Sequence, residues 1–214
     1  MKDEVKRSYS SPLREQAAAQ TRLLVRDAGH RLFARDGFAA TSMRRIAHEA
    51  GVSERTVYTH YRNKVELFQD ALNVAIAGDE EPVALRDRPS FAEVLAVPSA
   101  RELIAELVRR NGVVLERAGA LIMAGIESSG ADADMRRISD EGERAMRANC
   151  LALAEALVGT GEVRPELDAA QVADVLVTMC SPHVHQVLGW PADRYRDWLA
   201  STLTASLLRP VREP

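Results

Sequence analysis

Cysteine and aromatic residues are scarce in this chain, and long apolar runs are missing. Of its 214 residues, two are cysteines and 5% are aromatic. Cys150 and Cys180 fit neither a disulfide framework nor a metal-knuckle spacing, which points to a reducing, cytoplasmic compartment. No apolar stretch approaches the roughly eighteen residues that a membrane span needs, so we expect no membrane partner. Residues 1–16 mix both charge signs without an apolar centre, and we expect no secretory signal there.

Signatures of catalysis and metal binding are also lacking. There is no glycine-rich phosphate loop and no Ser/His/Asp spacing that stands out. His48-Glu49 lacks the second histidine of a zinc-protease helix. Cys180 and His183 lie three residues apart, but Pro182 interrupts their helix and no fourth ligand is evident. We therefore expect no enzyme activity, no metal and no cofactor.

What the chain has in quantity favours helices. Hydrophobic residues make up 46% and charged residues 28%, a balance typical of soluble globular proteins rather than disordered ones. Alanine, leucine, arginine and glutamate are abundant, and no convincing strand alternation or internal repeat is present. The predicted fold class is all-α, with roughly nine helices.

The charges are divided unevenly along the chain. Residues 1–64 contain 13 Lys/Arg and 7 Asp/Glu, a net of +6, whereas residues 65–214 contain 15 and 24, a net of −9. A basic third joined to an acidic remainder indicates one part that meets a polyanion and another that does not. Chance clustering on solvated faces is the plainer alternative.

The amino-terminal third divides into an arm and four helices. Residues 1–12 are polar and end in Pro12, which predicts a disordered basic arm. Leu24, Ala28 and Leu32 recur at helical spacing before Asp36-Gly37 closes the first helix. Thr41 or Ser42, then Ser53, then Asn63 can cap the next three helices. The predicted helices are 13–36, 41–50, 53–61 and 63–77.

The remainder begins with a connector. Residues 78–100 contain three prolines and leave room for one short helix. Long stretches with helical spacing follow, at 100–117, 119–129, 132–158, 168–188 and 191–208. We place the domain boundaries at 1–12 for the arm, 13–64 for a helix-turn-helix domain, 65–77 for a connecting helix and 78–214 for a second helical domain.

The stretch from Thr41 to Phe68 carries the functional signal. An eight-residue helix, a glycine-containing turn and a second short helix follow one another. Val57 and Tyr61, four residues apart, are expected to bury one side of the second helix. The opposite side then presents Glu54, Arg55, Tyr58 and Thr59, in the manner of a helix that meets base edges in a major groove.

Groups suited to phosphate surround this helix. Thr41 and Ser42 bring hydroxyls to a helix start, where backbone N–H groups also point outward. Arg44 and Arg45 follow on that helix. His60 offers a donor, and Lys64 adds a flexible positive charge at the start of the next helix. Such contacts fix register, whereas base contacts select sequence.

Two runs of residues resemble the tetracycline-repressor (TetR) family. One is Gly51-Val52-Ser53-x-x-Thr56-Val57-Tyr58-x-His60-Tyr61-x-Asn63-Lys64, and the other is Leu32-Phe33-Ala34-x-x-Gly37-Phe38-x-x-Thr41-Ser42-x-x-x-Ile46-Ala47. The resemblance covers about residues 20–70. It implies a three-helix DNA-binding domain followed by a variable helical domain that binds ligand and dimerises.

The resemblance also assigns roles. It implies that Arg44, Glu54, Arg55 and Tyr58 approach bases or the adjacent backbone, and that Ser42, His60 and Lys64 hold phosphates. Glu54 either accepts from a cytosine amino group or pairs with Arg55. Arg55 and Thr59 depart from what many relatives carry, so the operator sequence is not predictable. The full set of candidate DNA-binding residues is Thr41, Ser42, Arg44, Arg45, Glu54, Arg55, Thr56, Tyr58, Thr59, His60 and Lys64.

The acidic remainder resembles the family only in plan. Its last two helices, within 168–208, are the expected homodimer surface, as a four-helix bundle with their mates. Their apolar stripe comprises Val172, Val175, Leu176, Met179, Trp198, Leu199, Leu203 and Leu207. Residues that can line an effector pocket, with ordinary core packing as the alternative, are Met123, Ile126, Met146, Cys150, Leu153, Met179 and His183.

Together these features predict a homodimeric repressor that a small molecule releases from a palindromic operator. Two rival functions stay open. One is a helical ligand-binding protein with a vestigial DNA domain, and the other is a global DNA-binding protein without a specific operator.

Overall fold

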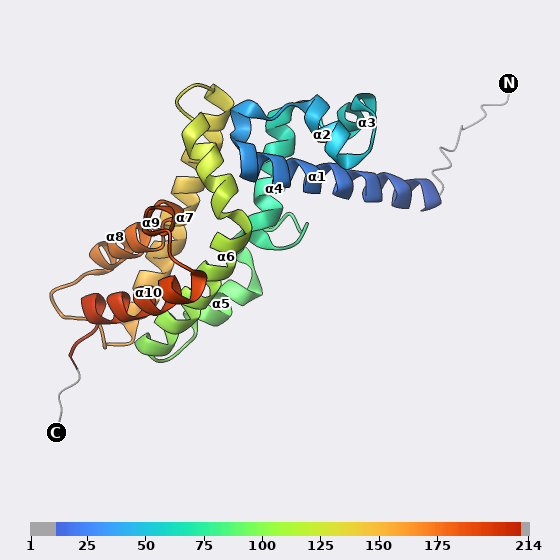
Figure 1. The fold of residues 1–214 in the computed structure, drawn as a ribbon. Helices are drawn as coiled ribbons and strands as arrows, with labels where there is room; N and C mark the ends of the chain where they lie inside the picture. The colour runs from blue at the N-terminus through green and yellow to red at the C-terminus, as the bar shows by residue number, and fades with distance from the viewer. Residues whose placement is uncertain (1–11, 211–214) are drawn as a thin grey trace. The chain divides into compact units, whose positions relative to one another are not determined.

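The computed structural model describes residues 12–210, and it is built from helices (Figure 1). Within that range the one extended pairing is an isolated bridge between Val163 and Leu208. The chain forms two compact units, Met1–Ala71 (unit 1) and Leu72–Pro214 (unit 2). The division falls inside α4, so one helix belongs to both units. The predicted all-α fold class is confirmed, with ten α-helices and one short 3-10 helix in the described residues.

Unit 1 contains α1 (Pro12–Ala40), α2 (Met43–Ala50), α3 (Glu54–His60) and the first half of α4 (Lys64–Ala77). Helix α1 is interrupted at Gly37, where φ is 78°, so its regular part closes where the sequence predicted. Pro12, assigned by its sequence to the arm, is instead the first residue of α1, a position that tolerates the missing N–H. The rest of the predicted arm lies outside the described residues.

The core of unit 1 forms where α1, α2 and α4 turn their apolar faces inward. Phe33, Phe38 and Phe68 meet with ring centroids 5.2 to 5.8 Å apart. Such offset and edge-on aromatic pairs add specificity to the burial of their area. Ile46 and Val57, both 0% exposed, attach α2 and α3 to the same core.

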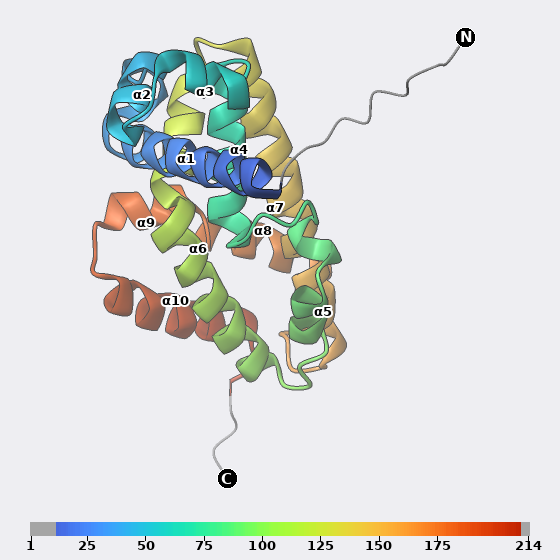
Figure 2. The ribbon, with the colours of Figure 1, turned by 90° about the vertical axis from the view of Figure 1, so that its right-hand side faces the viewer.

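Unit 2 begins with η1 (Leu85–Asp87) and α5 (Pro89–Leu95) in the predicted connector, and four long or medium helices and one short one follow (Figure 2). These are α6 (Ala100–Ser128), α7 (Ala133–Gly159), α8 (Ala169–Met179), α9 (Pro182–Leu188) and α10 (Ala192–Leu207).

Two predicted helix boundaries in unit 2 were wrong. The segments 100–117 and 119–129 form one helix, α6, because nothing between them supplies a cap or a break. The segment 168–188 is two helices, because Pro182 starts α9 and the Ser181 side chain accepts from the His183 N–H. One merged pair, one divided segment and the short α5 in the connector together give ten α-helices, where roughly nine helices were predicted.

The core of unit 2 lies among α6, α7, α8 and α10. Its best-buried members include Leu103, Leu157, Leu176, Leu199 and Leu203, each 0% exposed. Helix α8 begins with a reciprocal capping box between Asp168 and Gln171. None of the described helices is both long enough and apolar enough to cross a membrane.

Candidate nucleic-acid interface

Helix α2 is fixed at both ends by local hydrogen bonds. Of the two predicted caps, Ser42 takes the position, and its hydroxyl accepts from the Arg45 N–H at 3.3 Å. Gly51 ends the helix in the left-handed conformation, with φ 68°, and its N–H returns to the carbonyls of the last turn. This turn sets the angle at which the next helix leaves.

Helix α3 is short, and its cap and one apolar side chain position it. Ser53 accepts from the Thr56 N–H at 3.0 Å, and the Ser53 and Thr56 hydroxyls lie 2.7 Å apart. Thr56 is therefore half-buried and already bonded at the helix start. Val57 is 0% exposed and faces the core, as predicted.

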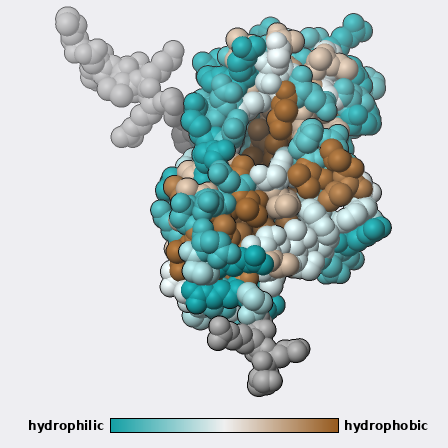
Figure 3. Space-filling view, turned by 90° about the vertical axis from the view of Figure 1, so that its left-hand side faces the viewer, coloured by the Kyte–Doolittle hydropathy of each residue, from teal (hydrophilic) through white to brown (hydrophobic). Residues whose placement is uncertain are grey.

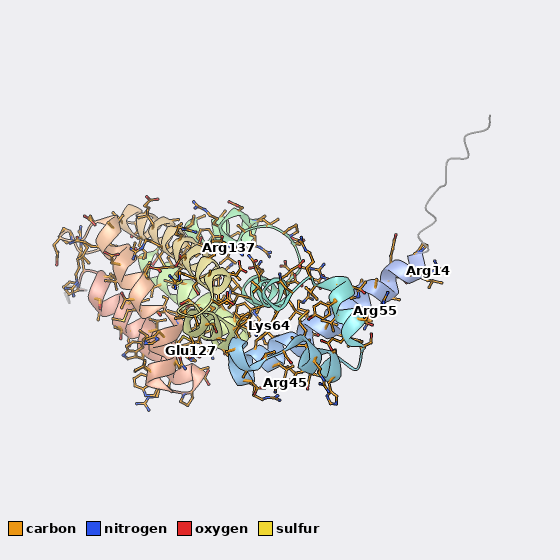
Figure 4. All side chains as sticks on the ribbon, turned by 90° about the horizontal axis from the view of Figure 1, so that it is seen from above. Arg14, Arg45, Arg55, Lys64, Glu127 and Arg137 are labelled. Carbon is orange, nitrogen blue, oxygen red and sulfur yellow. The ribbon has the colours of Figure 1, made fainter. Side chains whose placement is uncertain are left out.

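The opposite side of α3 faces solvent. Glu54 and Thr59 are exposed, and Tyr58 retains 49% of its surface. Arg55 is exposed on the same helix (Figure 4). The Thr59 hydroxyl donates to the Arg55 carbonyl at 3.0 Å. A helix with one buried side chain and a polar outer face has the form needed in a major groove.

Lys64 is held in place rather than flexible, which corrects the prediction from the sequence. Its Nζ donates to the carbonyls of Phe38 and Thr41 at 2.8 and 2.9 Å, and it lies 4.1 Å from the centroid of the Phe38 ring. The ammonium group thereby fastens the loop between α1 and α2 to the start of α4. His60, at the end of α3, is half-buried.

Thr41 does not present its hydroxyl to solvent, contrary to the prediction. The residue is 1% exposed, and its Oγ1 donates to the Gly37 carbonyl at 2.8 Å. The break in α1 at Gly37 creates this partner, because it leaves a carbonyl without a helical N–H. Thr41 is thus a structural residue of the α1–α2 loop.

The two arginines of α2 have different surroundings. Arg44 is exposed. Arg45 donates to the Ala40 carbonyl at 2.7 Å and pairs with Asp36. Hydrogen bonds from Arg35 and Arg45 lower the pKa of Asp36 to about 2. Asp36 was missed in the sequence, where it was noted only as a helix end.

The predicted effector-pocket residues do not gather around one hollow. Ile126, at 44% exposure, and His183 face solvent. Cys150 and Leu153 belong to the closed core, with Met146 and Met179 packed against it and only partly buried. Met123 is buried elsewhere on α6. The plainer alternative of core packing therefore describes Cys150 and Leu153.

Two shallow hollows of about 350 Å³ each lie elsewhere. One, in unit 1, is lined by Leu32, Arg35, Arg44, Arg45, His48 and Glu49. The other, in unit 2, is lined by Glu93, Val94, Val97, Glu102, Glu106 and Arg110. Neither contains a residue predicted to line the effector pocket.

One polar side chain inside unit 2 was missed by the sequence argument. The Nδ2 of Asn111 on α6 is buried and makes no hydrogen bond of normal geometry, although it lies near the Tyr195 hydroxyl. Tyr195 is 1% exposed and donates to the Met179 carbonyl at 2.9 Å. An amide in the middle of an apolar helix face is the signal that sequence reading could have used.

Most residues of the predicted dimer stripe are buried within unit 2 of the same chain. Its most apolar members are 0% exposed in unit 2: Val172, Leu176, Leu199, Leu203 and Leu207. Val175, Met179 and Trp198 are only partly buried, and Val187 on α9 is 74% exposed. Figure 3 shows apolar surface gathered at mid-height on the side of the molecule that carries α8 and α9. Part of the exposed apolar surface of unit 2 thus lies on α8, α9 and the start of α10.

A family profile and two known regulators are similar to this chain in sequence. The sequence profile of the bacterial regulatory proteins of the tetR family matches residues 25–71. The HTH-type transcriptional repressor BepR of Brucella suis is 27% identical over 210 residues, which cover 92% of this chain and 96% of BepR. The regulator AcrR of Shigella flexneri is 38% identical over 56 residues, 26% of each protein.

Solved structures share the fold over nearly the whole chain. A transcriptional regulator from Saccharomonospora viridis in complex with choline aligns with a TM-score of 0.69 and 22% identity, covering 89% of this chain and 99% of that one. NalD of Pseudomonas aeruginosa, the secondary repressor of a multidrug efflux pump, aligns with a TM-score of 0.63 and 20% identity, covering 90% and 99%. These relatives are regulators and not enzymes.

Proposed function

Because this chain is a member of the tetR family of bacterial regulatory proteins, we propose that it is a homodimeric repressor that a small molecule releases from a palindromic operator. The observation that carries the proposal is the solvent-facing side of α3. Arg55 and Tyr58 stand exposed on a helix whose inner side is closed by Val57. A repressor must meet its operator, so the proposed function implies a protein of the bacterial cytoplasm.

Contacts to DNA divide into readers and anchors. Arg44, Glu54, Arg55 and Tyr58 are the proposed readers of base edges or the nearby backbone. Ser42, His60 and Lys64 are the proposed phosphate contacts, with Arg45 and Thr59 at the margin. Thr41 is left out of direct contact, because it is 1% exposed and its hydroxyl donates to the Gly37 carbonyl, whereas the half-buried Thr56 stays a proposed contact beside Ser53.

Dimerisation is proposed through residues 168–208. The exposed Val187 and the partly buried Met179 and Trp198 supply apolar area for a twofold contact. Trp190 packs edge-on against Trp198, with ring centroids 5.8 Å apart, and widens that surface. Two copies of α3 then reach successive major grooves when they stand roughly 34–36 Å apart.

The proposed effector enters unit 2 beside Met146 and Met179. These thioethers adapt to irregular ligands, and both pack against the closed core. Asn111 offers a polar contact for a ligand that carries a hydrogen-bond acceptor. Choline is bound by the relative from Saccharomonospora viridis, so a small organic effector suits this fold. Release requires that the effector bind the free form more tightly than the DNA-bound form.

Fluorescence anisotropy tests the DNA-binding function. A duplex is selected from a random pool by the wild-type chain, and its affinity is measured against salt. We expect salt-sensitive binding to a palindrome, and a loss of at least tenfold in the Arg55→Ala, Tyr58→Ala double variant, because base contacts are each worth about 1–3 kcal/mol.

The matched control is Arg101→Ala, which removes an exposed charge from α6 in unit 2. It should bind as the wild type does. Equal affinity for every duplex would favour a global DNA-binding protein. The absence of any binding at low salt would favour a vestigial DNA domain.

A further inference from the structure

A carboxylate on α4 gathers side chains from two other helices of unit 1. The Tyr61 hydroxyl, at the end of α3, donates to Asp70 Oδ2 at 2.6 Å. Arg22 Nη2 and Arg26 Nη1, one turn apart on α1, lie 3.2 and 3.7 Å from the same carboxylate. The Arg22 guanidinium also lies 5.2 Å from the centroid of the Tyr61 ring. Asp70 therefore joins α1, α3 and α4.

This group is shielded from solvent. Tyr61 is 1% exposed, the Arg26 side chain retains 6% of its surface, and that of Asp70 retains 22%. Hydrogen bonds to an ionised carboxylate are short and about twice as strong as neutral ones. Burial and the bond to Asp70 raise the pKa of Tyr61, so its hydroxyl stays protonated and remains a donor. The Tyr61 hydroxyl thus remains available to donate to Asp70.

The orientation of α3 needs such a contact. The helix runs only from Glu54 to His60, too short to hold its shape or direction alone. Val57 attaches it to the core, but apolar burial has no directional preference. A turn of α3 about Val57 would move Arg55 and Tyr58 relative to base edges at little apolar cost.

We propose that Asp70 is a positioning residue that sets the angle of the recognition helix α3 by holding the hydroxyl of Tyr61. The inference rests on the proposed DNA-binding function and deepens it. Asp70 touches no DNA itself, because its carboxylate faces α1 and α3.

Other ties to α4 are less suited to this task. Arg62 and Glu66 pair at 3.3 Å, but the Arg62 side chain is 90% exposed, and such surface pairs contribute little. Lys64 holds carbonyls of the α1–α2 loop and not of α3. The bond from Tyr61 to Asp70 reaches the end of α3 in a shielded setting.

Selectivity distinguishes positioning from plain stabilisation. Affinities for the duplex selected by the wild type and for an unrelated duplex of equal length are measured for Tyr61→Phe and Asp70→Asn. We expect the ratio of the two affinities to fall about tenfold in each variant, while binding to the unrelated duplex keeps its strength and salt slope. The combined variant should lose no more than the larger single loss, because both remove one bond.

Asp79→Asn is the matched control, since it removes an equal charge from an ion pair with Arg88 in unit 2. Its ratio should stay at the wild-type value. Circular dichroism checks that each chain is folded before titration. A parallel fall in both affinities would show a structural role only, and an unchanged ratio would also overturn the inference. If the wild type selects no duplex at all, the proposed function itself fails, and this inference falls with it.

Discussion

At the scale of single residues, several side chains near α3 hold the fold together before they meet DNA. Lys64 lies where a phosphate contact was predicted, yet its ammonium bonds two backbone carbonyls of the α1–α2 loop. The side chains of Arg55 and Tyr58 are exposed on the outer side of α3. Loss of affinity in a Lys64 variant therefore mixes two effects, which separate when stability is measured alongside.

Replacing Lys64 with methionine tests this double role. Lys64→Met keeps the aliphatic stem but removes both N–H donors, so the carbonyls of Phe38 and Thr41 lose their partner. We expect the free energy of unfolding in urea to fall by about 1–3 kcal/mol. Arg62→Met, which breaks only an exposed pair, should change it by less than about 0.5 kcal/mol. Equal effects of the two substitutions would contradict the structural role of Lys64.

Residue roles that depend on helical spacing were predictable, and those that depend on a break in the backbone or on a distant partner were not. Val57 and Tyr61 were assigned to the core from their four-residue spacing, and both are buried. Thr41 was misassigned because its partner, the Gly37 carbonyl, exists only through the break in α1. Asp70 gave no signal, because Tyr61 and Arg26 meet it only after α1, α3 and α4 have packed.

At the scale of elements, caps and breaks were the most readable features. Ser53 and Asn63 cap α3 and α4 as predicted, since each bonds an N–H only three residues away. Pro182 was noted as disruptive, yet the segment 168–188 was still predicted as one helix. The result is α9, a short helix that carries Val187 into solvent.

A charge placed on α9 tests the proposed dimer surface. Val187→Glu puts a carboxylate where apolar area is proposed to meet its twofold mate, and the change occurs twice in each dimer. We expect the dimer dissociation constant, measured by sedimentation, to rise at least a hundredfold, because an unpaired buried charge is costly. Val83→Glu places the same charge on the connector, where Val83 is 40% exposed, and should leave the dimer intact. A dimer retained by Val187→Glu would move the interface elsewhere.

At the scale of the whole molecule, the two units differ in charge and in chemistry. Unit 1 contains the basic residues 1–64 and has a net positive charge, whereas unit 2 has a net negative charge and contains both cysteines. Cys150 and Cys180 are buried and unpaired. Burial raises the pKa of Cys150 to about 11 and that of Cys180 higher still. Since the thiolate is the reactive form, neither residue has the setting of a thiol sensor.

Thiol reactivity should therefore follow global unfolding. The labelling is done with a disulfide reagent at pH 8. This pH is well below the pKa of both thiols, so both stay protonated in the native chain. We expect reaction at least a hundredfold slower than in urea, where two thiols per chain should react at once. A Cys150→Ser variant assigns the residual rate to one site. Rapid native labelling of either thiol would point to an opened core and revive a sensing role.

The sequence by itself determined the helical class, the helix-turn-helix and its outward face, because caps, turns and helical periodicity act over a few residues. Tertiary structure alone decided which polar groups remain available to contact DNA. Lys64 and Thr41 were drawn into the α1–α2 loop, and the predicted dimer stripe was drawn largely into the core of unit 2. The partners of Lys64 and of the stripe lie far along the chain, and that of Thr41 is available only because α1 breaks at Gly37, so a pattern of neighbouring residues encodes neither.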